Sequence, residues 1–144
     1  MQRISVEEAR SFGVETKFDV MENGERRFRL NCSVDGSSYC RTVAAERGAW
    51  QNSHYHKLVS EFYVVQSGWI VYAERKEAEL HMCLLREGES VTFKPLIHHN
   101  IFLSSNSVIH TIKYGPPAEN DWFPSSELDK VTKHLDPYDL FVLS

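Results

Sequence analysis

The sequence predicts an all-β fold, a single antiparallel β-sandwich or barrel with a short helix near each end. Short apolar runs follow one another over residues 27–115. Turn residues separate these runs roughly every 8–12 residues, and no helical periodicity lies between them. This pattern is typical of antiparallel sandwiches and barrels rather than of strands that alternate with helices.

The first expected elements are a short helix and a hairpin. Ser5 is a suitable N-cap because Glu8 stands three residues later, and Gly13 is a suitable stop. The pair Asn23-Gly24 then predicts a hairpin turn, since both residue types readily adopt the backbone angles that such turns need. We therefore expect a hairpin at this point of the chain.

A series of short strands follows, with turn signals such as Asp35-Gly36 and Ser67-Gly68 between them. The expected strands are residues 27–34, 38–46, 60–66, 69–75, 78–85, 90–95, 98–104 and 108–115. Their alternation of polar and apolar residues predicts one face toward a core and one toward solvent.

The C-terminal segment differs in kind from the strands. Residues 125–135 (SSELDKVTKHL) predict a short helix with Ser126 as its N-cap and Asp129 in its first turn, ended before Pro137. The last residues, YDLFVLS, are apolar enough to pack against another surface. We expect one domain over residues 1–144, made of an N-terminal helix and hairpin (1–37), a barrel core (38–115) and a C-terminal extension (116–144).

Composition excludes several classes of partner. The chain has 144 residues, a formal net charge of -4 and no run of Lys or Arg longer than two, so neither nucleic acid nor an anionic membrane is an expected partner. No stretch approaches the roughly 18 apolar residues of a membrane span, and the first residues lack the apolar core of a secretory signal. Three cysteines without a CxxC pair favour reduced thiols in a cytoplasmic protein.

Three potential metal ligands stand at the start of one expected strand, in the stretch HYHKLVSEFYVVQSG (54–68). His54 and His56 point to the same face because strand side chains alternate with a period of two. Glu61 returns to that face if the chain turns through KLVS and re-enters a strand. Two imidazoles and a carboxylate at one end of a barrel suit a divalent transition metal.

A fourth ligand is available later in the chain. His98 and His99 follow a proline at the start of another strand. Only one of two adjacent strand residues can face inward. Either histidine satisfies the pattern, and the other then faces solvent or a neighbouring layer.

Residues 48–68 resemble the first motif of the cupin superfamily, which has the form G(X)5HXH(X)3–4E(X)6G. Gly48, His54, His56, Glu61 and Gly68 stand at every fixed position of that motif. The resemblance extends over roughly residues 38–115, about half of the chain.

The second cupin motif, G(X)5PXG(X)2H(X)3N, is matched only in part. Gly88 is present and His99 follows it at the expected eleven residues, but Pro95 is one place late and Leu103 occupies the Asn position. This spacing favours His99 over His98 as a ligand. A register slip of one residue would exchange the two.

The resemblance implies a cupin-like jelly roll that holds one divalent transition metal ion (Fe, Mn, Ni or Zn). The implied ligands are His54, His56, Glu61 and His99. The ligand set does not select one of these metals, since the same donors accept several ions.

Glu61, Tyr63 and His110 are the candidate catalytic residues. Tyr63 shares the parity of Glu61, so it either offers its hydroxyl to a ligand or serves as wall. His110 either faces the interior, where it binds substrate or moves a proton, or lies at the rim. Arg41 holds an anion if it faces inward and is a solvated charge if it faces outward, while Trp122 is expected to cap the barrel mouth or pack on a second subunit.

Two main functions follow from a site of this kind. The first is a metal-dependent enzyme that acts on a small oxygenated molecule, as a dioxygenase, isomerase, lyase or decarboxylase. The alternative is a non-catalytic cupin that binds a sugar or an organic acid, and a purely structural scaffold gives no reason for four ligands to converge. A homodimer is expected, because antiparallel sandwiches have edge strands that must be covered.

Overall fold

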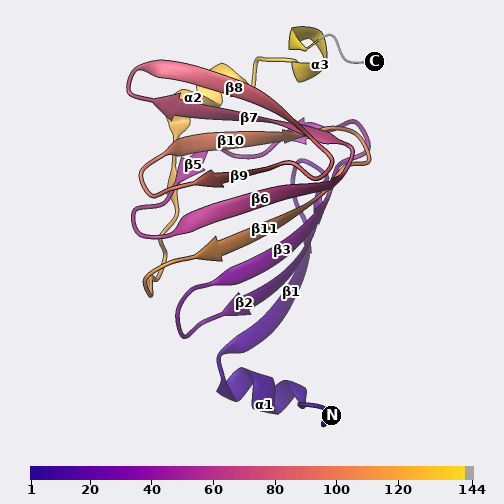
Figure 1. Ribbon diagram of the computed structural model, residues 1–144, viewed down its shortest axis with the longest axis vertical. Helices are drawn as coiled ribbons and strands as arrows, with labels where there is room; N and C mark the ends of the chain where they lie inside the picture. The colour runs from indigo at the N-terminus through magenta and orange to yellow at the C-terminus, as the bar shows by residue number, and fades with distance from the viewer. Residues whose placement is uncertain (142–144) are drawn as a thin grey trace.

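A computed structural model describes residues 1–141 and confirms the all-β prediction, with two antiparallel sheets and short helices (Figure 1). The first sheet contains, in spatial order, β1 (Val14–Val20), β2 (Arg26–Cys32), β3 (Ser38–Val43), β11 (Val108–Tyr114), β6 (Ser60–Ser67) and β9 (Ser90–Phe93). The second contains β12 (Phe123–Pro124), β5 (His54–Tyr55), β10 (His98–Leu103), β7 (Trp69–Lys76) and β8 (Glu79–Arg86), with β4 (Ala49–Trp50) beside β10.

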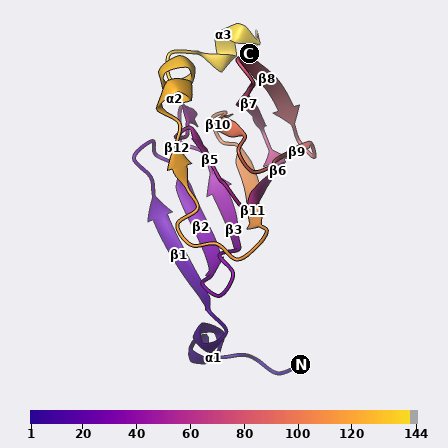
Figure 2. The same cartoon turned by 90° about the vertical axis from the view of Figure 1, so that its left-hand side faces the viewer.

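The two sheets face each other and enclose the main core. The side view shows β12 and β5 lying across from β2 and β3 (Figure 2). Buried apolar side chains from both sheets form one cluster: Ala44, Tyr63, Val65, Ile70, Leu85, Phe93, Ile101, Leu103 and Ile109. Along β6, buried and partly exposed residues alternate, which places Glu61, Tyr63 and Val65 on the interior face.

The hairpin turns lie where the sequence predicts them. The turn at Asn23-Gly24 joins β1 to β2, and the turn at Asp35-Gly36 joins β2 to β3. The hairpin of β1 and β2 therefore continues the first sheet beyond β3, in antiparallel register with it.

Two glycines of the histidine motif are needed for tight turns. Gly48 and Gly68 have φ values of +73° and +76°, a region that side chains with a Cβ rarely adopt. A Cβ on Gly48 would lie 2.7 Å from the carbonyl oxygen of Leu103, and one on Gly68 would lie 2.7 Å from Cβ of Ser107. Gly48 thus permits the turn before β4, and Gly68 permits the turn between β6, which carries Glu61, and β7.

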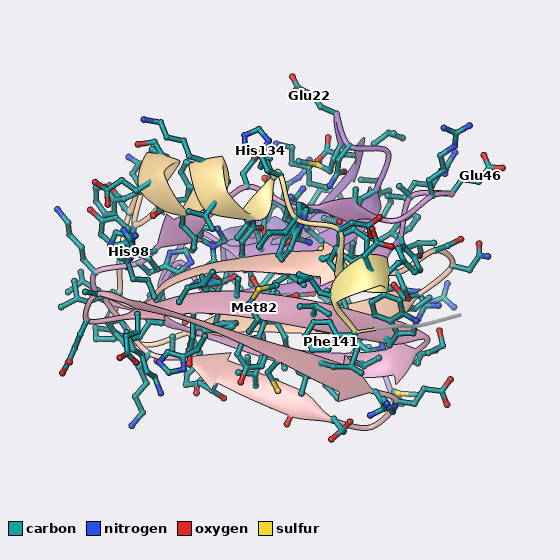
Figure 3. The ribbon with its side chains drawn as sticks, turned by 90° about the horizontal axis from the view of Figure 1, so that it is seen from above. Glu22, Glu46, Met82, His98, His134 and Phe141 are labelled. Atoms are coloured by element: carbon teal, nitrogen blue, oxygen red, sulfur yellow. The ribbon has the colours of Figure 1, made fainter. Side chains whose placement is uncertain are left out.

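The C-terminal segment packs on the outer face of the second sheet. Trp50, Val71, Ala73 and Phe102 form a second apolar cluster there, against which Leu135, Tyr138 and Phe141 pack (Figure 3). The indole of Trp50 donates a hydrogen bond to the carbonyl of Leu135 at 3.0 Å. The described part of the apolar tail therefore folds back on its own barrel, while residues 142–144 lie outside the described residues.

The helices agree with the predictions in part. In α1 (Val6–Ser11) the Ser5 hydroxyl accepts from the Glu8 amide at 3.1 Å, as predicted. The N-cap of α2 (Ser126–Thr132) is Ser125, so the prediction of Ser126 is wrong by one residue. A further helix, α3 (Pro137–Leu140), was not predicted. Within residues 1–141, no helix is long and apolar enough to cross a membrane.

Candidate metal centre

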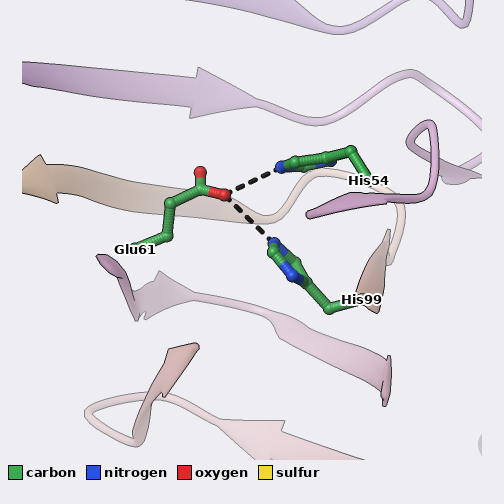
Figure 4. Close-up of side chains that lie close together, drawn as sticks. All are labelled: His54, Glu61 and His99. Carbon is green, nitrogen blue, oxygen red and sulfur yellow. Dashed lines mark hydrogen bonds and ion pairs between the residues drawn. The ribbon is translucent and has the colours of Figure 1, made fainter. Parts of the chain in front are cut away.

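Three imidazoles converge on one carboxylate oxygen inside the barrel. The Nε2 atoms of His54, His56 and His99 lie 2.8, 2.5 and 3.0 Å from Oε1 of Glu61 (Figure 4 shows two of them). All four residues are buried. Atoms of His54, Glu61 and His99 that could bind a metal all lie within 4.8 Å of one another.

Sheet pairing brings these residues together from distant parts of the chain. His54 on β5 is paired directly with His99 on β10 in the second sheet. Glu61 opens β6 in the first sheet and points across the barrel toward them. His56 follows β5 and keeps the parity of His54, as the period of two requires.

The second nitrogen of each ring is also engaged. In every case Nδ1 faces a backbone carbonyl, which can only accept a hydrogen bond, so Nδ1 carries the proton. The acceptors are Asn52 for His54 at 2.9 Å, Ile97 for His99 at 2.9 Å, and Asp121 for His56. In a neutral ring, Nε2 then presents a lone pair to the centre of the cluster.

Aromatic neighbours fix two of the rings. The ring of Phe93 is stacked on that of His99, with centroids 4.1 Å apart and planes within 4°. Trp122 is stacked on His54 with centroids 5.4 Å apart. The ring orientations are therefore set by packing as well as by hydrogen bonds, which is how proteins commonly hold metal-binding histidines.

The donor set fits a divalent transition metal. Three Nε2 lone pairs and a carboxylate oxygen would repel one another unless positive charge lay between them. Either protons on Nε2 or a metal ion supplies that charge, and imidazole with carboxylate is a ligand set for Zn, Fe, Ni or Cu. The four implied ligands therefore stand together in an arrangement that suits a divalent transition metal ion.

Two pKa shifts leave Glu61 ionised and the His99 ring neutral at neutral pH. Burial raises the pKa of Glu61, but its close contacts with Nε2 of His54, His56 and His99 outweigh burial and hold the pKa well below its usual range. Burial lowers the pKa of His99, against a smaller opposing effect of Glu61. An ionised carboxylate and a neutral imidazole are the forms that bind metals.

Tyr63 lies beside the cluster and holds the carboxylate in place. Its hydroxyl donates to Oε2 of Glu61 at 2.9 Å, which leaves Oε1 for the histidines. Burial, and then the negative charge of Glu61, raise the pKa of Tyr63 well above its usual range. The phenol therefore remains a hydrogen-bond donor at neutral pH.

His110 does not face the interior, one of the two positions that the sequence leaves open for it. His110 is paired with Val64 and Arg41, whose side chains lie on the opposite face of the first sheet from Glu61. It accepts a hydrogen bond from the Tyr39 hydroxyl at 2.6 Å and contacts the side-chain oxygen of Gln66. Arg41 also faces outward and donates to Gln66 at 3.2 Å.

The structure places His99, and not His98, beside Glu61. His98 points to the other side of β10, where its Nδ1 lies 2.7 Å from the Ser125 hydroxyl. Its ring stacks on Tyr55 with centroids 4.1 Å apart. The Ser125 side chain makes no capping hydrogen bond to α2.

Sequence reasoning missed Asp121, which holds the loop between the histidine pair and Glu61. Its carboxylate accepts hydrogen bonds from the amides of Lys57, Leu58 and Val59 at 2.7, 2.9 and 3.0 Å. Its backbone carbonyl accepts from His56. No local pattern marks this residue, because its partners lie more than sixty positions earlier in the chain.

We expect Asp121→Ala to destabilise the protein by about 1–2 kcal/mol, because three amides lose their acceptor. Burial raises the pKa of Asp121, but these amides outweigh it and keep the pKa below its ordinary value of 3.8. The ionised carboxylate stabilises the fold fully when the pH is above the ordinary pKa. This stabilisation is lost as the pH falls from there through the lower pKa of the folded state. Urea unfolding at pH 7 and pH 3 checks this, and an equal difference from wild type at both pH values would contradict it.

A small cavity opens beside the cluster. It has a volume of about 150 Å³. Its lining residues come from both sheets and from the segment before β12: Arg27, Arg29, Ser38, Cys40, Thr42, Gln51, His54, Glu61, Tyr63, Thr111, Lys113 and Trp122. Trp122 therefore lines the cavity, with its ring stacked on His54.

Comparison with known proteins identifies the fold. No protein-family model matches the chain, and none of the curated proteins matches it either. Among solved structures, oxalate decarboxylase from Bacillus subtilis is 16% identical with a TM-score of 0.64, over 89% of this chain and 34% of that one. The chain thus spans about a third of the length of that protein.

Two shorter proteins match over most of their own length. KdgF from Halomonas sp. is 18% identical with a TM-score of 0.56, over 73% of this chain and 89% of that one. The cupin domain of Drosophila melanogaster CENP-C is 17% identical with a TM-score of 0.55, over 69% of this chain and 76% of that one. The protein has the cupin fold.

Proposed function

We propose that this cupin binds one divalent transition metal ion through His54, His56, Glu61 and His99. The observation that carries the proposal is the convergence of three Nε2 atoms on Oε1 of Glu61. The Nδ1 atom of each ring is hydrogen-bonded to a backbone carbonyl at the same time. Burying a carboxylate and three imidazoles together costs free energy unless a cation lies between them. Fe, Mn, Ni and Zn all accept these donors.

We further propose that the protein is an enzyme that acts on a small oxygenated molecule. Four protein ligands leave two positions free on an octahedral ion, and open positions distinguish catalytic from structural metal sites. A bound metal supplies Lewis acidity toward a substrate oxygen or lowers the pKa of bound water. The chain places Tyr63 against Glu61 and a cavity of about 150 Å³ beside the ligands, so a small substrate has room there.

The test is to purify the protein without added metal or chelator, to measure bound metals by elemental analysis, and to assay the loaded protein. Near-stoichiometric metal, together with turnover in assays for oxygenation, isomerisation, elimination or decarboxylation of small hydroxy and oxo compounds, is the expected result. Metal without turnover would favour the non-catalytic binding alternative. No metal after reconstitution would overturn the proposal.

We propose that the protein forms a homodimer through the outer face of the first sheet. Apolar side chains of β1 and β2 stand exposed there, among them Phe18 and Val20, each 67% exposed, and Leu30, 44% exposed. Exposed apolar groups that gather on one face commonly mark an interface. We expect a dimeric mass by light scattering and a monomer for Phe18→Asp, and a monomeric wild type at micromolar concentration would contradict the proposal.

We also propose a cytoplasmic location. Cys32, Cys40 and Cys83 are all free and only partly buried, which suits a reducing compartment. Fractionation of the native cells checks this, and recovery in a secreted fraction would contradict it.

A further inference from the structure

The cavity beside the metal centre is lined by more positive than negative charge. Three of its lining residues are cationic, Arg27, Arg29 and Lys113, whereas Glu61 is its one carboxylate among the described residues and is a proposed metal ligand. A bound metal ion would add further positive charge. The interior is therefore suited to a ligand that carries negative charge.

Lys113 is the cation nearest to the ligands in the sheet. It is paired with Glu61 across β11 and β6, so both side chains lie on the interior face with their Cβ atoms about 5 Å apart. On its other side Lys113 is paired with Ser38 of β3, which also lines the cavity. A group held by Lys113 would thus lie next to the metal centre.

The three cations differ in how far they are neutralised. Arg27 donates to Oε1 of Glu25 through Nε and Nη2, at 3.2 and 2.8 Å, and Arg29 donates to Asp19 at 3.0 Å. Lys113 makes no ion pair with any carboxylate of residues 1–141. An ammonium group that no carboxylate neutralises can bind an anion through a charge-assisted hydrogen bond.

We propose that the cavity binds a small organic anion, a carboxylate or a phosphate ester, with Lys113 as its main charged contact. The inference rests on the proposed function, because it takes the cavity beside the metal centre as the substrate site. Ser38, Thr42 and Gln51 offer neutral hydrogen-bonding groups around the same space. The volume of about 150 Å³ limits the ligand to roughly the size of a benzene ring.

A wider groove adjoins the cavity and is expected to select less strongly for an anion. The groove has a volume of about 880 Å³ and shares Arg29, Ser38 and Lys113 with the cavity. The charges of the groove balance, since its three cations (Lys17, Arg29 and Lys113) stand with three carboxylates (Glu15, Asp19 and Glu22). Selection for an anion is therefore made in the cavity, where the cations outnumber the carboxylates.

Calorimetric titration of the purified protein with malonate, inorganic phosphate and glycerol tests the inference. Malonate or phosphate is expected to bind, and which of them binds more tightly identifies the carboxylate or the phosphate class. Glycerol, which is neutral and of similar size, is expected not to bind. Lys113→Met is expected to weaken the affinity for the anion at least about tenfold, because a charge-assisted hydrogen bond is lost. Lys113→Arg is expected to keep the affinity within a few-fold of that of wild type.

Lys17→Met is the matched control. It removes the same charge from the groove, on an exposed residue paired with Arg29, but it does not line the cavity. Binding of the anion within about twofold of wild type is expected, since an exposed charge interacts weakly. Equal effects of the two substitutions, tight glycerol binding, or no anion binding to wild type would overturn the inference.

Metal content measured on the same samples separates the two proposals. Binding of the anion that depends on Lys113 in a protein that takes up no metal would support the anion site and overturn the metal proposal. Stoichiometric metal with unchanged anion affinity in Lys113→Met would do the reverse. A melting temperature for each variant shows whether it is folded.

Discussion

Replacing His56 with alanine is expected to reduce the bound metal to near zero while the barrel remains folded. His56 is 2% exposed, and its Nε2 lies 2.5 Å from Oε1 of Glu61, so its loss removes one of the four proposed ligands and opens a gap beside the others. The cost to the free energy of unfolding of the metal-free protein is expected to be about 1–3 kcal/mol, as for other buried truncations. Elemental analysis and a melting curve measure the two effects.

His110→Ala is the matched control for this prediction. It removes the same side chain from a half-buried position on the opposite face of the first sheet. Metal content is therefore expected to equal that of wild type. Retention of stoichiometric metal by His56→Ala would remove His56 from the ligand set, whatever the control shows.

The interior positions of β6 could be predicted from the sequence because the information is local. Two histidines one residue apart must share a face, and the burial of Glu61, Tyr63 and Val65 follows from the same period of two. Placing Glu61 on the same face as the two histidines requires the assumption that residues 57–60 (KLVS) reverse the chain. The structure has that turn. The side chain of Asp121 holds it, through partners that spacing alone does not reveal.

The face on which His110 lies could not be predicted in this way. β11 carries apolar residues on both faces, with Val108 and Ile112 on the side of His110 and Ile109 on the interior side. Its alternation alone therefore does not say which face is interior. A shift of one residue would exchange the two faces of the strand.

The residues that surround the ligands are contributed by segments far apart in the chain. Lys113 comes to lie beside Glu61 only through the pairing of β11 with β6, and Trp122 reaches His54 from the segment before β12. The proposed ligand set can therefore be inferred from motif spacing, whereas the lining of the cavity beside it depends on sheet order. A fold shared with many proteins does not supply that lining either, since function depends on the site.

His99→Ala is expected to weaken metal binding by at least about 100-fold, because loss of even an outer partner of a ligand typically costs 10–100-fold. His99 is 1% exposed, its Nε2 lies 3.0 Å from Oε1 of Glu61, and Phe93 fixes its ring. His98→Ala removes a contact with Ser125 and a stack on Tyr55, and neither touches the cluster. Its effect on metal affinity is therefore expected to stay below about tenfold.

The comparison of these adjacent histidines tests the register of β10. The two substitutions delete the same side chain from neighbouring positions of one strand, so propensity and chain entropy change in nearly the same way. A competition titration with a chromophoric chelator measures both affinities under the same conditions. The reverse order would mean that β10 is displaced by one residue against β5 and β7, which would turn His98 inward and exchange every interior side chain of that strand.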